Sequence, residues 1–396
     1  MLSKKLIVLG LLLISLLCIS SVSAAEDFAN DTLSADNDNK IILDESINED
    51  VLNNKNENEE LILSTDNQNS KSLETDIEDE TLSDAVGTFT DHGNEKYIGA
   101  DETGRINVAD GSIKKGTFTD LENQINNAGG HSLDLSYDFE YDPVYDAGKF
   151  PDGISFSKHS DDGTFYFTIN GNGHSICGNE LSRIFVIWDY APLELKDLTL
   201  CHGFAEDGSA VLVTQNSVLK ACNVTFIHNN ATFNGGAIAG IGDVRVLDCI
   251  FINNSAKFRG GAIHESDSIE VRGCIFVGND IYGPQSSGEF GGAAIYNDGI
   301  SSRMYDSIIA YNNPSYKDGD NVYGAVVVYG DTSMSNMTFT NNKGRFGGAL
   351  VAITGYGSLT VKDSRFDQNE DYQGGAIFSD PKSLYVYDSN FTSNNA

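Results

Sequence analysis

The fold is decided by the stretch Asp248-Cys249-Ile250-Phe251-Ile252-Asn253-Asn254 and the step that soon follows it, Gly260-Gly261-Ala262-Ile263. The turn-forming Asp248 stands three residues before Phe251, and Asn254 stands three residues after it. The same combination of turn former, apolar residue, asparagine and Gly-Gly-Ala step recurs along the chain. A repeat of this length predicts either a solenoid or an array of propeller blades.

The repeat is clearest when the chain is aligned on its recurring aromatic or aliphatic residue, called the anchor below. The anchors are Leu200, Phe226, Phe251, Phe276, Ile309, Phe339, Phe366 and Phe391, at intervals of 26, 25, 25, 33, 30, 27 and 25 residues. The turn formers three residues earlier are Asp197, Asn223, Asp248, Gly273, Asp306, Asn336, Asp363 and Asp388. The asparagines three residues later are Asn229, Asn254, Asn279, Asn312, Asn342, Asn369 and Asn394.

The side-chain pattern favours a parallel β-solenoid over a propeller. Apolar residues alternate within short strands, as at Ile269 and Val271 or Leu384 and Val386, which predicts strands with one buried face. In-register coils would place equivalent residues about 4.8 Å apart. The asparagines would then form a ladder of hydrogen-bonded amides, and Gly-Gly would turn the chain where a Cβ atom clashes. We therefore predict an all-β fold.

The chain divides into four regions. Residues 1–24 have the features of a secretory signal peptide, with Lys4 and Lys5, an apolar run to Leu17 and cleavage expected after Ala24. Residues 25–85 predict a disordered, acidic, Asn-rich linker, because nineteen acidic residues face three basic ones between positions 26 and 85. We expect an N-terminal cap and irregular first coils over 86–192, and regular repeats over 193–396.

The expected cap contains a short amphipathic helix around residues 119–125. Thr119 or Asp120 can cap its start, and Leu121 and Ile125 lie on one face. At the other end, the chain stops at Ala396, before the Gly-Gly-Ala step of its unit. We expect an incomplete last coil, which belongs to a fragment of a longer protein or is covered by a partner.

The repeats resemble those of a known group of proteins. The coils look like right-handed parallel β-helix repeats, and the Gly-Gly-Ala-Ile step is similar to that of polymorphic outer-membrane-protein repeats. Two segments resemble adhesin-like proteins of methanogenic archaea, namely Thr168-Ile169-Asn170-Gly171-Asn172-Gly173-His174-Ser175-Ile176 and Ser182-Arg183-Ile184-Phe185. The resemblance covers roughly residues 117–396. It implies a pectin-lyase-like fold and an adhesin-like role at the cell surface.

The net charge excludes one class of partner, and the cysteine positions indicate which cysteines belong to the core. The net charge of −33 excludes nucleic acid as a natural partner, because nucleic acid is itself a polyanion. The apolar run near the N-terminus has no counterpart later in the chain, so we expect no membrane span once the signal peptide is removed. Cys249 and Cys274 occupy equivalent inward places and indicate core packing, whereas Cys177 and Cys201 have no partner that the sequence shows.

The sequence gives little support to catalysis or metal binding. Parallel β-helices include polysaccharide lyases and hydrolases, but the polygalacturonase motifs are absent. The acidic pairs Asp161-Asp162 and Asp318-Gly319-Asp320 are common in turns. Asp318 and Asp320 are the candidates for calcium ligands, although the rest of a calcium-binding loop is missing. We expect no cofactor and no catalytic residue.

Two longer coils carry the candidate binding site. Their extra residues form loops at about 281–290 and 314–323, and insertions in a solenoid often carry binding. The aromatic residues there are Tyr282, Phe290, Tyr311, Tyr316 and Tyr323. Exposed rings would offer stacking area to sugars or to protein partners. Alternatively, the rings pack the loops onto their own coils.

We therefore expect an exported, non-catalytic, adhesin-like protein that recognises a glycan, a wall polymer or a surface protein of another cell. The alternatives are a polysaccharide lyase or hydrolase of the same fold and a passive surface stalk.

Overall fold

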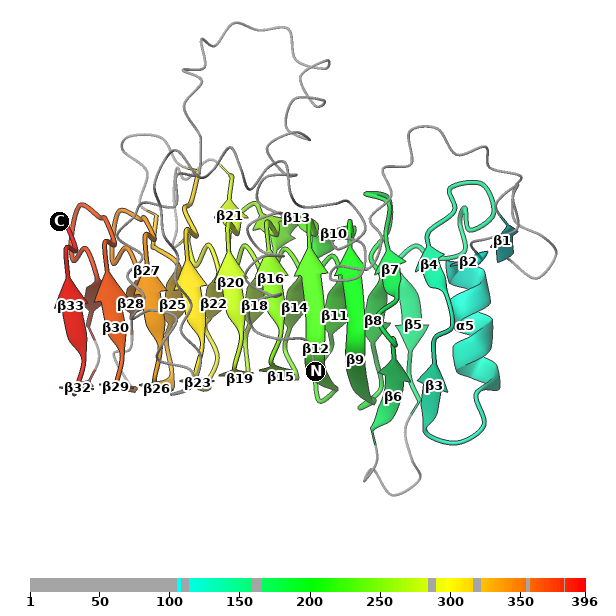
Figure 1. Ribbon diagram of the computed structural model, residues 1–396, viewed down its shortest axis with the longest axis horizontal. Helices are drawn as coiled ribbons and strands as arrows, with labels where there is room; N and C mark the ends of the chain where they lie inside the picture. The colour runs from blue at the N-terminus through cyan, green and yellow to red at the C-terminus, as the bar shows by residue number, and fades with distance from the viewer. Residues whose placement is uncertain are drawn as a thin grey trace, which may run out of the picture. The chain divides into compact units, whose positions relative to one another are not determined.

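The computed structural model describes residues 105–107, 114–158, 166–283, 290–315, 322–353, 357–380 and 382–396. The predicted signal peptide and acidic linker lie outside these residues. The described part is a parallel β-solenoid, and successive coils lie side by side in Figure 1. In that view the front strands point upward, the chain returns behind them and the coils advance to the left, so the solenoid is right-handed. The predicted fold class is confirmed.

Each regular coil contributes to three surfaces, which are named here. The five-residue face comprises β6 (Phe167–Asn170), β15 (Asp243–Leu247), β19 (Ser268–Arg272), β23 (Ser301–Tyr305), β26 (Asp331–Ser335), β29 (Ser358–Lys362) and β32 (Ser383–Tyr387). The three-residue face comprises β7 (Ser175–Cys177), β16 (Ile250–Ile252), β20 (Ile275–Val277), β24 (Ile308–Ala310), β27 (Thr338–Thr340), β30 (Arg365–Asp367) and β33 (Asn390–Thr392). Two longer strands, β9 (Pro192–Cys201) and β12 (Val218–Ile227), run through both faces.

The third surface is the back sheet of nine strands. They are β5 (Ile154–Phe156), β8 (Phe185–Ile187), β11 (Val211–Val213), β14 (Ile238–Gly240), β18 (Ile263–Glu265), β22 (Ile295–Asn297), β25 (Val326–Val328), β28 (Leu350–Ala352) and β31 (Ile377–Ser379). A short sheet lies between the three-residue face and the back sheet along the chain, with β10 (Phe204–Asp207), β13 (Asn230–Asn234), β17 (Ser255–Ala256) and β21 (Asp280–Ile281).

The predicted turn formers make the corner between the five-residue and three-residue faces. All eight have a positive φ, between 46° and 67°. Aspartate, asparagine and glycine tolerate this left-handed conformation better than other residues do. A single residue at each corner therefore turns the chain from the five-residue face to the three-residue face. In the next strand, side chains again alternate between the core and the outer surface.

The predicted asparagine ladder is present and buried. The Nδ2 atom of Asn254 donates to Oδ1 of Asn279 in the next coil at 3.0 Å, and to the carbonyl oxygen of Phe226 at 3.0 Å. The Asn254 backbone N–H also donates to Asn279 Oδ1 at 3.0 Å. The same links join consecutive asparagines from Asn229 to Asn394. The ladder satisfies backbone groups that a buried corner would otherwise leave without partners.

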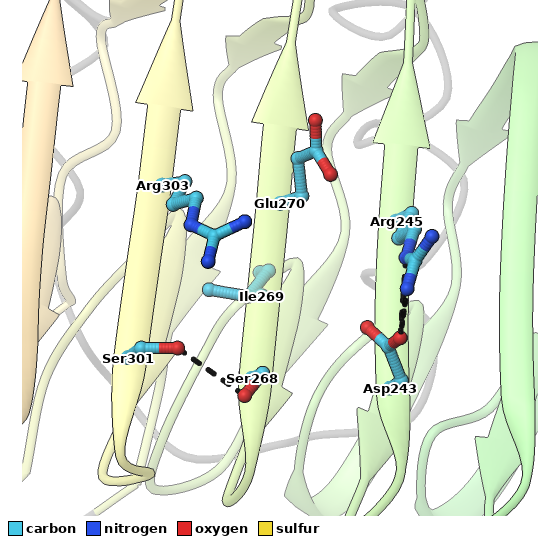
Figure 2. A pocket seen from close by; sticks show the side chains of 7 residues that line it. All are labelled: Asp243, Arg245, Ser268, Ile269, Glu270, Ser301 and Arg303. Atoms are coloured by element: carbon cyan, nitrogen blue, oxygen red, sulfur yellow. Dashed lines mark hydrogen bonds and ion pairs between the residues drawn. The ribbon is translucent and has the colours of Figure 1, made fainter.

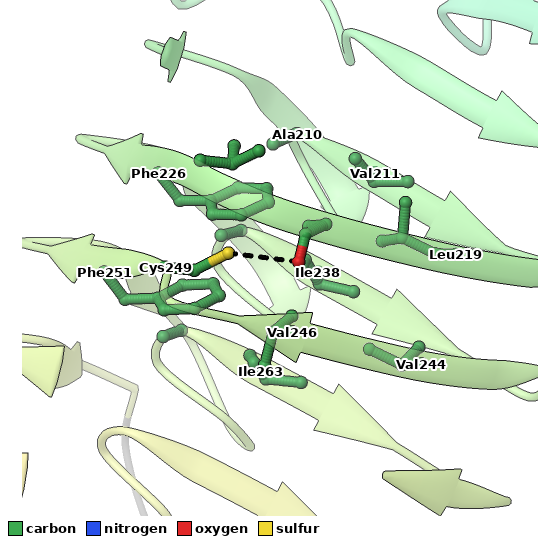
Figure 3. Packing of buried hydrophobic residues seen from close by; sticks show 14 of the residues in the cluster. Ala210, Val211, Leu219, Phe226, Ile238, Val244, Val246, Cys249, Phe251 and Ile263 are labelled. Atoms are coloured by element: carbon green, nitrogen blue, oxygen red, sulfur yellow. Dashed lines mark hydrogen bonds between the residues drawn. The ribbon is translucent and has the colours of Figure 1, made fainter. Parts of the chain in front are cut away.

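The anchors stack inside the solenoid. The ring centroids of Phe226 and Phe251 are 4.6 Å apart with nearly parallel planes, and those of Phe251 and Phe276 are 4.5 Å apart. Figure 3 shows this stack beside the apolar side chains of the back sheet and the five-residue face. At the Gly-Gly step, a Cβ atom added to Gly236 would lie 1.9 Å from the Gly261 carbonyl oxygen, so only glycine fits.

The first coils are capped by α5 (Phe118–Asn127). Thr117 is the N-cap, because its hydroxyl accepts a hydrogen bond from the Asp120 backbone N–H at 3.2 Å. The predicted caps, Thr119 and Asp120, were therefore wrong by two and three residues. The Asp146 carboxylate accepts hydrogen bonds from the Phe118 and Thr119 N–H groups, which have no partner within the helix. Phe118, Leu121 and Ile125 join the core.

Four further strands lie at the N-terminal end of the described chain. They are β1 (Arg105–Asn107), β2 (Lys114–Thr117), β3 (Ser132–Asp134) and β4 (Asp138–Glu140), and β1 pairs antiparallel with β2.

The cysteines behave in two ways. Cys249 and Cys274 are free and fully buried, which confirms the predicted core packing. The Cys249 thiol donates to the Ala221 carbonyl oxygen at 3.4 Å. A disulfide joins Cys177 and Cys201, for which the sequence showed no partner. These two residues are in register on β7 and β9, so coil stacking brings them together.

Candidate functional site

Two hollows on the outer surface are candidates for a binding site. The first lies on the five-residue face and has a volume of about 260 Å³. In Figure 2, Arg303 and Arg245 extend from β23 and β15, on either side of Glu270 on β19. Ser268 and Ser301 lie at its lower edge, with 3.2 Å between their hydroxyl oxygens.

Several charged side chains of the five-residue face pair with one another. The Arg245 guanidinium binds the Asp243 carboxylate, with Nε 3.1 Å from Oδ2. Glu194 lies 2.9 Å from the ammonium groups of both Lys196 and Lys220. Burial alone would raise the pKa of Glu194, but these bonds and one from Thr168 outweigh it and hold the pKa below its ordinary value. Of the charged residues that line the first hollow, Asp243 and Arg245 form an ion pair in the described residues, whereas Glu270 and Arg303 do not. The first hollow is smaller than the second and has no aromatic residue in its lining.

The second hollow, called the groove, lies on the outer side of the back sheet and has a volume of about 570 Å³. It is lined by Trp188, Asp189, Tyr190, Asp207, Leu212, Val213, Thr214, Gln215, Asn216, Asn234, Ala239, Gly240, Ile241 and His264. These residues belong to neighbouring coils. The groove is therefore created by stacking and does not belong to any single loop.

Strand register explains how the groove is formed. Leu212, Ala239 and His264 are the central residues of β11, β14 and β18, and they are in register. The side chains of Leu212 and Ala239 are shorter than that of Tyr296, which occupies the same row in β22. Short side chains between bulkier turn residues leave a hollow.

The turns that follow the back-sheet strands form one rim of the groove. Trp188 and Tyr190 are 41% and 70% exposed, and Ile241 in a later turn is 53% exposed. Asp189 and Tyr190 have φ of 57° and 64°, and the Ala191 N–H donates to the Trp188 carbonyl oxygen at 3.0 Å. These constraints hold two aromatic side chains in an outward position beside amide and hydroxyl groups of the next turn.

A polar cluster lies at the end of the groove nearest the C-terminus. Asp298 Oδ1 accepts a hydrogen bond from the Ser266 hydroxyl at 2.6 Å and lies 3.7 Å from His264 Nε2. Its other oxygen lies 3.3 Å from an Arg259 nitrogen. Burial favours a higher pKa for Asp298, but His264, Ser266 and Arg259 outweigh it and lower the pKa. Asp298 therefore stays ionised, and it holds His264 and Arg259 in place.

The described aromatic residues of the predicted loop site contact their own part of the solenoid. The Tyr282 hydroxyl donates to the Ala231 carbonyl oxygen at 3.0 Å. The Phe290 ring lies 5.3 Å from that of Phe258, and the Tyr323 ring lies 6.0 Å from that of Phe346. These contacts fit the alternative in which the rings pack the loops onto the coils.

The other predicted site residues differ in how far the structure describes them. Tyr311 adopts a positive φ of 56° at the turn just before the ladder residue Asn312. Tyr316 and the calcium candidates Asp318 and Asp320 lie outside the described residues. None of the predicted residues that the structure describes lines either hollow, and the loop site remains a prediction.

Sequence reasoning missed the groove altogether. One signal was present: Trp188 is the only tryptophan of the chain, and it lies in a turn next to Tyr190. Aromatic residues in turns are often exposed, but their polar neighbours in the groove come from positions one to three coils away. Those neighbours become visible only when the strand register is known.

The described residues show neither a metal-binding cluster nor a helix suited to cross a membrane. Among them, no group of three or more histidine, cysteine, aspartate or glutamate side chains is arranged to hold a metal ion. In the same residues, no helix has both the length and the apolar character needed to cross a membrane.

Comparison with known proteins gives one match. The family model of the Chlamydia polymorphic membrane protein repeat matches residues 248–264 of this chain. The match covers one repeat, from the corner residue Asp248 through the Gly-Gly-Ala step to β18. No curated protein and no solved structure matches the chain.

Proposed function

We propose that this protein is a surface-exposed, adhesin-like protein that binds a glycan in the groove on its back sheet. The repeat match and the solenoid support the adhesin-like part, because the matched repeat is named for a membrane protein. The observation that carries the binding part is the placement of Trp188 and Tyr190 beside polar side chains in an open hollow.

The chemistry of the groove suits sugars. A pyranose ring has one face of C–H groups that packs on an aromatic ring, and a rim of hydroxyls that needs hydrogen-bonding partners. Trp188 and Tyr190 supply the rings, while Thr214, Gln215 and Asn216 supply donors and acceptors. The groove extends over several coils spaced about 4.8 Å apart, which suits an oligosaccharide better than a single sugar.

Binding of the full-length protein to a glycan array tests the proposal. Trp188→Ala is expected to lower affinity for the bound glycan by about tenfold or more, which corresponds to about 1.4 kcal/mol. Tyr190→Ala should act in the same direction. Both side chains are exposed, so the β-rich circular dichroism should not change.

Two variants serve as matched controls. Tyr372 is exposed to the same 70% as Tyr190, and Tyr282 is exposed to the same 41% as Trp188, but both lie outside the groove. Tyr372→Ala should leave binding unchanged. If Tyr282→Ala abolishes binding while Trp188→Ala does not, the site is in the predicted loops and the groove proposal is wrong.

Binding is proposed to occur without cleavage. Incubation of the protein with the glycans it binds, followed by mass spectrometry, should return the glycans intact. Shortened products would favour the lyase or hydrolase alternative. If the protein binds no glycan, the passive-stalk alternative gains support.

A further inference from the structure

The groove contains carboxylates but no lysine or arginine side chain among its lining residues. We propose, on the basis of the proposed function, that it prefers oligosaccharides that carry protonated amino groups. Neutral oligosaccharides bind more weakly, and acidic ones are rejected. The charges that face the groove, and the pairing of the charges near it, favour this preference.

Asp189 is the charge most available to a ligand. It is exposed at the rim, between Trp188 and Tyr190, and its φ of 57° is fixed by the turn. In the part of the chain that the structure describes, its carboxylate makes no hydrogen bond or ion pair. Asp207, across the groove, uses one oxygen to accept the Asn234 backbone N–H at 3.0 Å. A ligand ammonium group near the aromatic rim would meet a carboxylate that has no competing partner.

The cations close to the groove are already engaged. The Arg183 guanidinium is buried and donates to the carbonyl oxygens of Asp152 and Asp207, each at 2.9 Å, and to that of Gly208 at 3.1 Å. The Arg259 guanidinium pairs with Asp298 and lies over the Tyr296 ring, 5.0 Å from its centroid. Neither arginine is among the groove-lining residues, so a ligand carboxylate or sulfate would find no arginine partner there.

The charge of the whole chain acts in the same direction. With a net charge of −33, the protein attracts cationic ligands and repels anionic ones over distances comparable to the Debye length. The cationic side chains on the five-residue face offer no alternative for the groove, because they lie on a different sheet. Local and global charge therefore select against acidic glycans together.

Calorimetry with the full-length protein and three oligosaccharides of equal length tests this preference. The probes are oligomers of glucosamine, N-acetylglucosamine and galacturonic acid, which carry amino, neutral and acidic groups. In about 0.01 M salt, where the Debye length is about 30 Å, we expect affinity to fall in that order. In about 1 M salt, the difference between the glucosamine and N-acetylglucosamine oligomers should nearly disappear.

A pair of variants separates the local carboxylate from the overall charge. Asp189→Asn should weaken binding of the glucosamine oligomer by about two- to fivefold at low salt, and leave the N-acetylglucosamine oligomer unchanged. Asp248→Asn is the matched control, because Asp248 is also an exposed aspartate with a positive φ, 54°, and it lies outside the groove. Asparagine tolerates this conformation, so both variants should fold.

The outcomes distinguish the two proposals. Binding of the galacturonic acid oligomer as tight as that of the glucosamine oligomer overturns the amino-sugar preference but leaves glycan binding intact. An amino preference that survives Asp189→Asn unchanged also overturns it. If none of the three oligomers binds and the glycan array is also blank, the proposed function itself fails.

Discussion

The two ends of the coil stack are held together by different chemistry. From Asn229 onward, buried asparagines join each coil to the next. One coil earlier, Gly203 takes the place of asparagine, and its N–H donates to Asn229 Oδ1 at 2.9 Å. There the Cys177–Cys201 disulfide joins neighbouring strands instead. An amide ladder requires the same residue in every coil, whereas a covalent link requires only two residues and suits irregular coils.

The outer side of the back sheet differs between the same two regions. Its central row includes Leu212, Ala239 and His264, which line the groove, and continues with Tyr296, Val327 and Val351. These last three form a buried cluster, against which Tyr323 and other partly buried side chains pack. The same backbone thus gives an open hollow at one end and a filled surface at the other. The difference lies in the outward residues, which the core does not constrain.

Breaking the covalent link should have the largest effect on stability. Replacement of Cys177 and Cys201 by serine opens a loop whose ends are separated by 24 residues, and is expected to cost about 3 kcal/mol. Urea unfolding followed by circular dichroism measures the loss. Reductant should destabilise the unmodified protein by a similar amount and leave the double variant unchanged. An unchanged unfolding midpoint would show that the disulfide does not stabilise the first coils.

Breaking the amide ladder at its centre should cost somewhat less, about 2 kcal/mol. Asn279→Ala removes the acceptor of the Asn254 backbone and side-chain donors, and leaves these buried N–H groups without a partner. Asn394→Ala, in the partly exposed last coil, is the matched control and should cost well under 1 kcal/mol. Equal losses in the two variants would mean that burial does not decide the contribution of the ladder.

The smallest effects are expected from pH, with opposite signs in the two regions. Burial raises the pKa of Asp371 to about 7, whereas that of Glu194 is lowered. The contribution of Asp371 to the free energy of unfolding is fully present below its ordinary pKa of 3.8, and it is lost as the pH rises through about 7. That of Glu194 is present above its ordinary value of 4.5 and is lost as the pH falls through the lowered pKa.

Two amide variants separate the contributions of Asp371 and Glu194 to stability. Asp371→Asn should stabilise the protein relative to the unmodified chain by about 1 kcal/mol above neutral pH, and the gain should vanish in acid. Glu194→Gln should behave in reverse, with its cost visible at neutral pH and shrinking in acid. Thermal unfolding across this pH range is the measurement. Parallel profiles for the two variants would contradict the assigned environments.

Much of the interior was predictable because coil positions repeat. Asp248, Asn254 and Phe251 each have equivalents one period away. In the structure these rows of residues form the corners with positive φ, the amide ladder and the stack of anchors, respectively. The disulfide was not predictable from the repeat, although Cys177 and Cys201 hold equivalent positions. Ile176 is in register with the anchor Leu200, but their separation of 24 residues is shorter than every interval between the anchors.

The groove was not predictable in this way. Trp188, Asn216 and His264 have unrelated neighbours in sequence, and no period links them. They meet because their strands stack in register and because Leu212 and Ala239 leave room between the turns. The helix start illustrates the same limit: Asp146 lies 28 residues along the chain from Phe118, yet its carboxylate accepts the Phe118 N–H.

The sequence by itself determined the coil: its length, its corners, its inward residues and its amide ladder. Each of these depends on local backbone preference or on burial, and repetition makes such features visible. Only the tertiary structure decided which coils are covalently joined, which outer row is open and which charges remain unpaired at the groove. Those features depend on contacts between side chains of different coils. The repeat does not specify which residues stand at these positions.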